Sequence, residues 1–196
     1  AMIPAIELGA SEKEQRTLET LLSTPANYFK ILLGKFATVF SSSFLAALCT
    51  AIGLLIAMNM VNISEEVYSV LSSLLNTKTI ILIMILLIPL SAFFAALALS
   101  ISIYSKSFKE AQSFMSQMIM IVVIPAIIGM SLPLSLNIGN ALIPIFNVVL
   151  SCKEIMAGTI DISLLIVVFI STLILSIMSV YLSSKLFKKE SFIFRN

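Results

Sequence analysis

The chain of 196 residues contains no histidine and only two cysteines. The lack of histidine removes imidazole as a general acid, a general base or a metal ligand. Cys49 and Cys152 are too few and too far apart to form a metal-binding or disulfide motif. The sequence also lacks the G-x-x-x-x-G-K-[ST] pattern, so this chain supplies no phosphate-binding loop. We therefore expect no catalytic residue, no metal site and no cofactor bound by this chain.

Charge is scarce and is absent from four long stretches. Charged residues make up 11% of the chain and hydrophobic residues 59%, and the mean hydropathy is +1.10. The uncharged runs are Phe36–Met60, Thr79–Ser105, Ala111–Cys152 and Ile162–Ser184. Runs of about 20 apolar residues cross a bilayer as helices, because unpaired backbone groups are not tolerated in lipid. The sequence predicts an all-α integral membrane protein. The lack of ionisable residues in the spans disfavours an ion-coupled carrier or an intramembrane protease.

The basic residues are distributed unevenly between the two sides of the predicted membrane domain. Ten of them can lie on one side: Lys13, Arg16, Lys30, Lys35, Lys106, Lys109, Lys185, Lys188, Lys189 and Arg195. Only Lys78 and Lys153 then lie on the other side. The positive-inside rule makes the first side cytoplasmic, so we expect a multi-pass protein of the cell membrane with both termini cytoplasmic. Ala1–Leu8 is too short for a cleavable signal peptide.

The uncharged run of 42 residues, Ala111–Cys152, requires separate treatment. Two crossings within it would place the basic C-terminal tail outside, against the charge distribution. Ser116–Leu132 suits a full span, whereas the segment beyond it is rich in Pro, Gly and Asn, and Ala141–Leu150 is too short to cross. We therefore predict four full transmembrane helices and one re-entrant half-span on the outer side. The residues assigned to this outer re-entrant segment are Asn137, Pro144, Asn147, Lys153 and Glu154. Lys153 and Glu154 could either anchor the segment at the interface or gate substrate release.

The stretch EKEQRTLETLLSTP, Glu12–Pro25, predicts an amphipathic helix before the first complete span. Ser11 and Glu14 form an S-x-x-E capping box, and the helix should end near Ser23 because of the following proline. Leu18, Leu21 and Leu22 share one face. Such a helix suits either the docking of a soluble partner or a solvated juxtamembrane position.

Three further segments predict packing rather than chemistry. Asn62–Leu75, in the loop between the first two spans, could form an outer surface helix. The small residues Ala92, Ala95, Ala96 and Ser100 predict a close-packing face on the second span. The hydroxyl groups of the last span suit helix packing better than substrate contact: Ser171, Thr172, Ser176, Ser179 and Ser183.

The stretch Glu12–Pro25, together with the YFKILLGK that follows it, resembles a motif of type-2 ABC exporter permeases. In that family, E-K-E-x-x-T-L-E-x-L-L-x-[ST]-P leads to G-K before the third transmembrane helix. Gly34–Lys35 stands at the expected place. Gln15–Arg16 stands where the family often has Arg–Gly, which is a departure. Ile143–Gly158 resembles the outer re-entrant segment of the family, especially in its sodium-efflux branch.

The resemblance implies the permease subunit of an ATP-binding cassette exporter that works by alternating access. The residues implied to couple it to the ATPase are Glu12, Lys13, Glu14, Arg16, Thr17, Leu18, Glu19, Leu21, Leu22 and Pro25. A separate ATPase subunit would bind ATP and Mg²⁺, and the other partners would be a second or homologous permease and the lipid bilayer, with no nucleic acid.

The resemblance also divides the chain into three parts. Residues 1–35 would hold the end of a truncated span (Met2–Leu8) and the coupling helix, residues 36–186 the transmembrane domain, and residues 187–196 a basic tail. The substrate stays open between sodium, a lipid, a drug and a peptide. The alternative function is a non-transporting membrane scaffold or assembly protein.

Overall fold

The computed structural model describes residues 2–17, 28–60 and 77–193. Its elements follow in the order α1 (Met2–Ile6), the π-helical turn η1 (Glu7–Ser11), α2 (Glu12–Glu14), α4 (Tyr28–Met60), α6 (Thr77–Tyr104), α7 (Phe108–Ser131), α8 (Ile138–Ala141), α9 (Phe146–Ala157) and α10 (Ile162–Ile193). No strand occurs within these ranges. The predicted all-helical class is confirmed.

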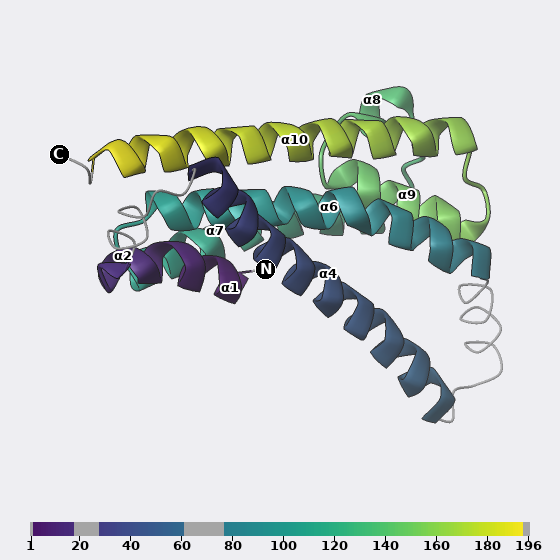
Figure 1. Cartoon of the computed structure of the whole chain (residues 1–196). Coiled ribbons are helices and arrows are strands. Elements are labelled where there is room, and N and C mark those ends of the chain that lie inside the picture. The colour runs from purple at the N-terminus through teal and green to yellow at the C-terminus, as the bar shows by residue number, and fades with distance from the viewer. Residues whose placement is uncertain (1, 18–27, 61–76, 194–196) are drawn as a thin grey trace.

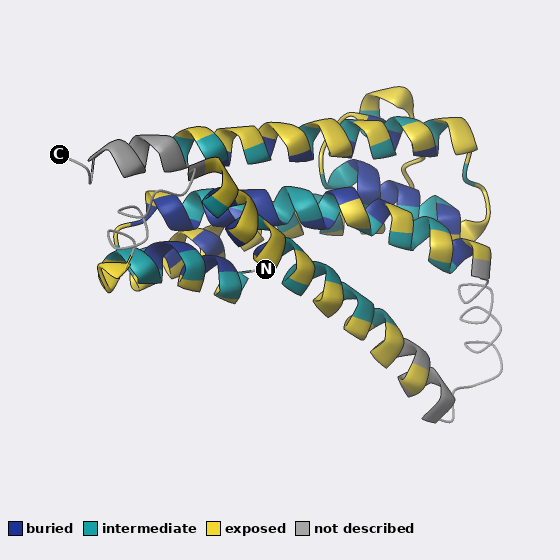
Figure 2. Cartoon of the chain, in the orientation of Figure 1, coloured by how far each residue is buried: buried dark blue, intermediate teal, exposed yellow. Residues whose placement is uncertain are grey.

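Four helices are long and apolar enough to cross a bilayer. The qualifying segments are Phe29–Gly53, Lys78–Tyr104, Phe108–Ser131 and Ile162–Leu186. They overlap the four predicted spans. The first and the third begin earlier than expected, and they therefore include Lys30 and Lys35 and, in the third, Lys109 and Glu110. Many large apolar side chains on α7 and α10 are exposed, and Figure 2 shows this for α10 by the yellow along that helix. A surface this apolar indicates a protein surrounded by lipid rather than water.

Helix α6 is the centre of the bundle. It packs most extensively against α10 and also contacts α4, α7 and α1 (Figure 1). Helix α4 contacts α6 near its own start and leans away from it toward its other end. We call the end of the bundle where α4 and α7 begin and α6 and α10 end the basic end, because Lys35, Lys106, Lys109 and Lys185 lie there.

The predicted packing faces of α6 and α10 are confirmed. Ala95 and Ala96 are fully buried, and small residues at these positions let helices approach closely. On α10, Thr172, Ser176, Ser179 and Ser183 are buried. The Ser183 hydroxyl bonds to the Ala96 carbonyl at 2.9 Å, and so joins α10 to α6. The Thr172 hydroxyl instead bonds to carbonyl groups of α10 itself, so Ser183 provides the hydroxyl contact to α6 while the other buried positions fit helix packing.

The prediction for the N-terminal segment was wrong in two respects. Helical structure begins at Met2, so Ser11 lies inside a helix with φ −66° and ψ −39°, and its side chain makes no capping bond. The helix then ends at Glu14, and the chain turns at Arg16 with φ +59°, so no continuous helix runs from Ser11 to Ser23. The capping box failed because the preceding apolar residues Ala5 and Ile6 are buried and keep the chain helical through Ser11.

Candidate functional site

The N-terminal helix crosses α6 near its end, and Ser102 fastens the two together. The π-helical turn η1 packs against α6. The Ala10 amide donates to the Ser102 hydroxyl at 2.8 Å, and that hydroxyl lies 3.4 Å from the Ile6 carbonyl. Gly9 provides the space for this contact, because it has no side chain.

Glu12 contacts α4 through a partly buried ion pair. The Lys35 ammonium donates to the Glu12 carboxylate and, at 2.6 Å, to the Leu8 carbonyl. Lys35 is only 6% exposed. A buried ammonium needs such partners, since an unpaired charge away from water is strongly unfavourable. Sequence reasoning did not assign Lys35 to the site, although the Gly34–Lys35 match pointed to it.

Lys13 contacts the end of α6. Its ammonium donates to the Ile103 carbonyl and lies 3.3 Å from the Ser105 carbonyl. The last carbonyl groups of a helix have no partner within the helix and carry partial negative charge. A lysine at this position satisfies them and complements the helix dipole.

Glu14 contacts the start of α7. Its carboxylate accepts a hydrogen bond of 2.9 Å from the Phe108 amide, at the positive end of the helix. The same terminus is capped by the Ser107 hydroxyl, which accepts from the Glu110 amide, while the Glu110 carboxylate accepts from the Lys106 backbone amide. The S-x-x-E pattern at Ser107 was the available signal for this cap, and sequence reasoning missed it.

The remaining predicted coupling residues divide into two groups. Arg16 and Thr17 are exposed, and the Thr17 hydroxyl bonds to the Glu12 carbonyl at 3.2 Å. Leu18, Glu19, Leu21, Leu22 and Pro25 lie outside the described residues. The structure therefore brings together Glu12, Lys13 and Glu14, and all three engage groups of this chain.

A second cluster of predicted residues lies at the other end of the bundle, where α8 and α9 pack beside α10 and α7. No continuous helix runs from Asn137 to Leu150, as predicted. The chain turns at Ile145, which has φ +72° and ψ −54°, and the Phe146 amide bonds to the Pro144 carbonyl at 2.8 Å. This is a γ-turn of the rare positive-φ form, which is strained for a β-branched residue.

Asn147 holds this turn in place. It is fully buried, and its side-chain amide donates to the Ala141 carbonyl at 3.0 Å and to the Ser171 hydroxyl at 3.1 Å. It thereby joins α8, α9 and α10. Asn137 and Pro144 are exposed and take part through their backbone carbonyls.

Lys153 and Glu154 hold the extended segment between α7 and α8. The Lys153 ammonium donates to the Leu132 carbonyl at 2.7 Å, and the Glu154 carboxylate accepts from the Leu136 amide at 2.5 Å. Both side chains therefore tie α9 to the segment that precedes α8.

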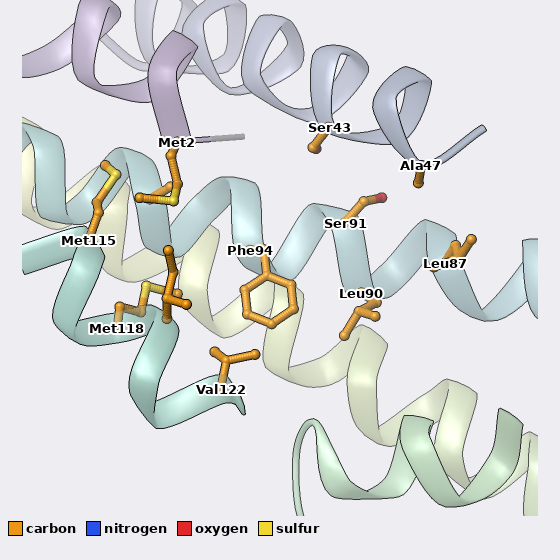
Figure 3. A pocket seen from close by; sticks show the side chains of 12 residues that line it. Met2, Ser43, Ala47, Leu87, Leu90, Ser91, Phe94, Met115, Met118 and Val122 are labelled. Carbon is orange, nitrogen blue, oxygen red and sulfur yellow. The ribbon is translucent and has the colours of Figure 1, made fainter. Parts of the chain in front are cut away.

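An apolar groove lies between α1, α4, α6 and α7. Its volume is about 310 Å³, and it is lined chiefly by apolar side chains such as Met2, Phe94, Met115 and Met118. Figure 3 shows these side chains together with Ser43 and Ser91 around the groove. No charged side chain lines it. Among the described residues, no group of His, Cys, Asp or Glu could hold a metal ion.

The comparisons with known proteins agree with this architecture. The family model of the ABC-2 family transporter protein matches residues 1–183. The chain therefore belongs to the ABC-2 transporter family, whose members are membrane subunits of ABC transporters. It is similar to the ABC transporter permease protein NatB of Bacillus subtilis (strain 168), with 32% identity over 163 residues. The match covers 82% of this chain and 42% of that relative, so the chain spans less than half of the relative's length. No solved structure matches the chain.

Proposed function

We propose that this chain belongs to the permease of an ATP-driven exporter and that a separate ATPase, which binds ATP and Mg²⁺, drives it by alternating access. The observation that carries the proposal is the position of Glu12, Lys13 and Glu14. They attach the segment leading into residues 18–25 to three long helices: to α4 at Lys35, to the end of α6 and to the start of α7. A partner that moves this segment can therefore move the membrane domain. The basic end, where this segment lies, would face the cytoplasm under the positive-inside rule.

The exposed face of α7 supports a second permease subunit as partner. Gln112, Ser113, Ser116 and Gln117 are exposed on a helix whose surroundings are otherwise apolar. A glutamine facing lipid is unfavourable unless another polar group pairs with it. A second copy of the permease, or a homologous one, supplies such groups and would enclose a substrate path.

The segment α8–α9 is proposed to be the outer re-entrant half-span. Helix α9 has 12 residues, which corresponds to a length of about 18 Å, against about 30 Å for the hydrocarbon core. It would enter the bilayer only part of the way and return. Asn147 supports this role because its hydrogen bonds close the turn inside the bundle.

The function is tested by Leu22→Asp in the complete permease, expressed with its ATPase. Buried apolar side chains carry most of the energy of an interface, so an aspartate at the predicted docking face should abolish ATPase binding. Leu22→Met is the matched control and should bind normally. The measurements are co-purification of the ATPase and vanadate-sensitive ATP hydrolysis.

Two results would contradict the proposal. If Leu22→Asp left both binding and hydrolysis intact, residues 18–25 would not be the docking segment. If the unmodified permease retained no ATPase at all, the alternative of a non-transporting scaffold or assembly protein would be favoured.

A further inference from the structure

We propose that Glu12, Lys13 and Glu14 form a three-way clamp that transmits movement of the following segment to α4, α6 and α7 together. This inference rests on the proposed function, in which an ATPase moves that segment. The resemblance in sequence implied only that these three residues help to couple the permease to the ATPase. In the structure, each of the three side chains contacts a different long helix of its own chain.

The helical geometry explains how three consecutive residues reach three helices. Successive side chains on a helix are separated by about 100° around its axis. Glu12, Lys13 and Glu14 therefore spread over about 200°, which allows each to contact a different neighbour of α2. Charged residues spaced by three or four positions would instead lie on one face and contact one neighbour.

The signs of the three charges match their partners. Lys13 meets the carbonyl groups at the end of α6, where a cation is favourable. Glu14 meets the first amide of α7, where an anion is favourable. Glu12 meets the ammonium of Lys35 on α4. Inverting the sign of each charge would place each one against a group of the same sign.

The attachments are arranged to carry displacement. The ends held by Lys13 and Glu14 belong to consecutive helices, because only residues 105–107 separate α6 from α7. Ser102 adds a further contact between α6 and η1 one turn away. The Lys35 side of this ion pair is buried and Glu12 is half-buried, so water reaches the pair less easily than it would on an open surface. A rigid connection of this kind passes on a movement instead of absorbing it.

The test uses the complete transporter, purified with its ATPase and lacking native cysteines. Spin labels are attached at two exposed positions, Ile52 on α4 and Met130 on α7. Their separation is measured by pulsed electron paramagnetic resonance before and after trapping with ATP and vanadate. We expect nucleotide trapping to change this separation.

Three substitutions on α4 distinguish the clamp from a general effect of charge. Lys35→Met should lower, by roughly threefold or more, the fraction of molecules whose spin-label separation changes on trapping. A reduction of this size is within the range of measured coupling effects. Lys35→Arg keeps the charge and should retain most of the change. Lys30→Met is the matched control, since Lys30 is an exposed lysine on the same helix, and it should behave as wild type.

Glu14→Ala provides an independent test that does not disturb a buried residue, because Glu14 is exposed. It should reduce the change in separation while ATPase binding and the melting temperature remain as in wild type. If Lys35→Met and Glu14→Ala both keep the full change in spin-label separation, the clamp is refuted. It is also refuted if the two variants lose that change only together with ATPase binding or thermal stability. If the unmodified transporter retains no ATPase, the proposed function itself fails, and the clamp with it.

Discussion

Gly9 on η1 and Ser102 on α6 lie so close together that a Cβ atom on residue 9 would be 2.2 Å from the Ser102 Oγ and 3.0 Å from its backbone carbon. Real contacts are never that short, so only glycine fits at residue 9. The contact fixes where the N-terminal helix crosses α6 and brings the Ala10 amide within reach of the Ser102 hydroxyl. Glu12, Lys13 and Glu14 follow within the next five residues and depend on this crossing point.

We predict that Gly9→Ala lowers stability by about 1–3 kcal/mol, the usual effect of overpacking a close contact. The matched control is Gly53→Ala, because a Cβ there meets nothing within 4 Å and the residue lies inside α4. Alanine at that position should be neutral or stabilising by up to about 1 kcal/mol. Thermal unfolding in detergent measures both. Equal melting temperatures for the two variants would contradict the close contact.

The turn after Glu14 makes a second prediction. Arg16 adopts the left-handed conformation, with φ +59°, in which a side chain costs about 1 kcal/mol and glycine costs little. This is the position at which the resembling family often has glycine. Arg16→Gly should therefore stabilise the helix end by about 1 kcal/mol. Gln15→Gly should do the reverse, because Gln15 has an ordinary helical φ of −84°. If Gln15→Gly were more stable than Arg16→Gly, the turn at Arg16 would not be formed.

The orientation of the chain is predicted from its basic end. In intact cells, a cysteine introduced at Thr159, in the exposed connection before α10, should react with an impermeant maleimide. A cysteine at Lys109, at the basic end, should react only after the membrane is permeabilised. Both are measured on a background without Cys49 and Cys152. If only residue 109 were labelled in intact cells, the orientation of the chain in the membrane would be opposite to the predicted one. Glu65, also predicted to be external, lies outside the described residues.

The hydrogen bonds of Asn147 should be necessary for the packing of α8 and α9. Asn147→Ala removes both side-chain bonds from a fully buried site, so we expect a loss of about 1–3 kcal/mol. Asn140→Ala removes one exposed bond, to the Ser135 carbonyl, and should cost less than about 0.5 kcal/mol. Denaturation in mixed micelles compares the two. Equal losses would mean that the Asn147 contacts add nothing beyond an exposed bond.

Cys152 makes stability depend on pH in the alkaline range. Burial raises the pKa of this thiol from 9.0 to about 11, because the thiolate is poorly solvated. The unfolded chain ionises first, so the contribution of this group is intact below about pH 9 and is lost as the pH rises toward 11. The melting temperature of wild type should therefore fall more between pH 8 and pH 10.5 than that of Cys152→Ala. If the melting temperatures of wild type and Cys152→Ala fell in parallel with pH, the Cys152 thiol would not be buried.

The sequence by itself determined the class of protein and the number of spans. Uncharged runs such as Thr79–Ser105 and Ile162–Ser184 must be helical in lipid, whatever their neighbours, because their backbone groups have no other partner. The break after Leu132 was predictable for the same local reason, since the prolines and asparagines that follow do not sustain a span. The resemblance around Glu12–Pro25 gave the family.

Tertiary structure decided what the charged residues contact. The S-x-x-E pattern at Ser11 predicted a helix cap. Burial of Ala5 and Ile6 against neighbouring helices instead keeps the chain helical through Ser11. Glu12, Lys13 and Glu14 resemble a solvated face, yet Lys35 on α4, the end of α6 and the start of α7 meet them at the basic end. Local sequence cannot reveal such partners, because a charge carries no information about which helix terminus the fold brings beside it.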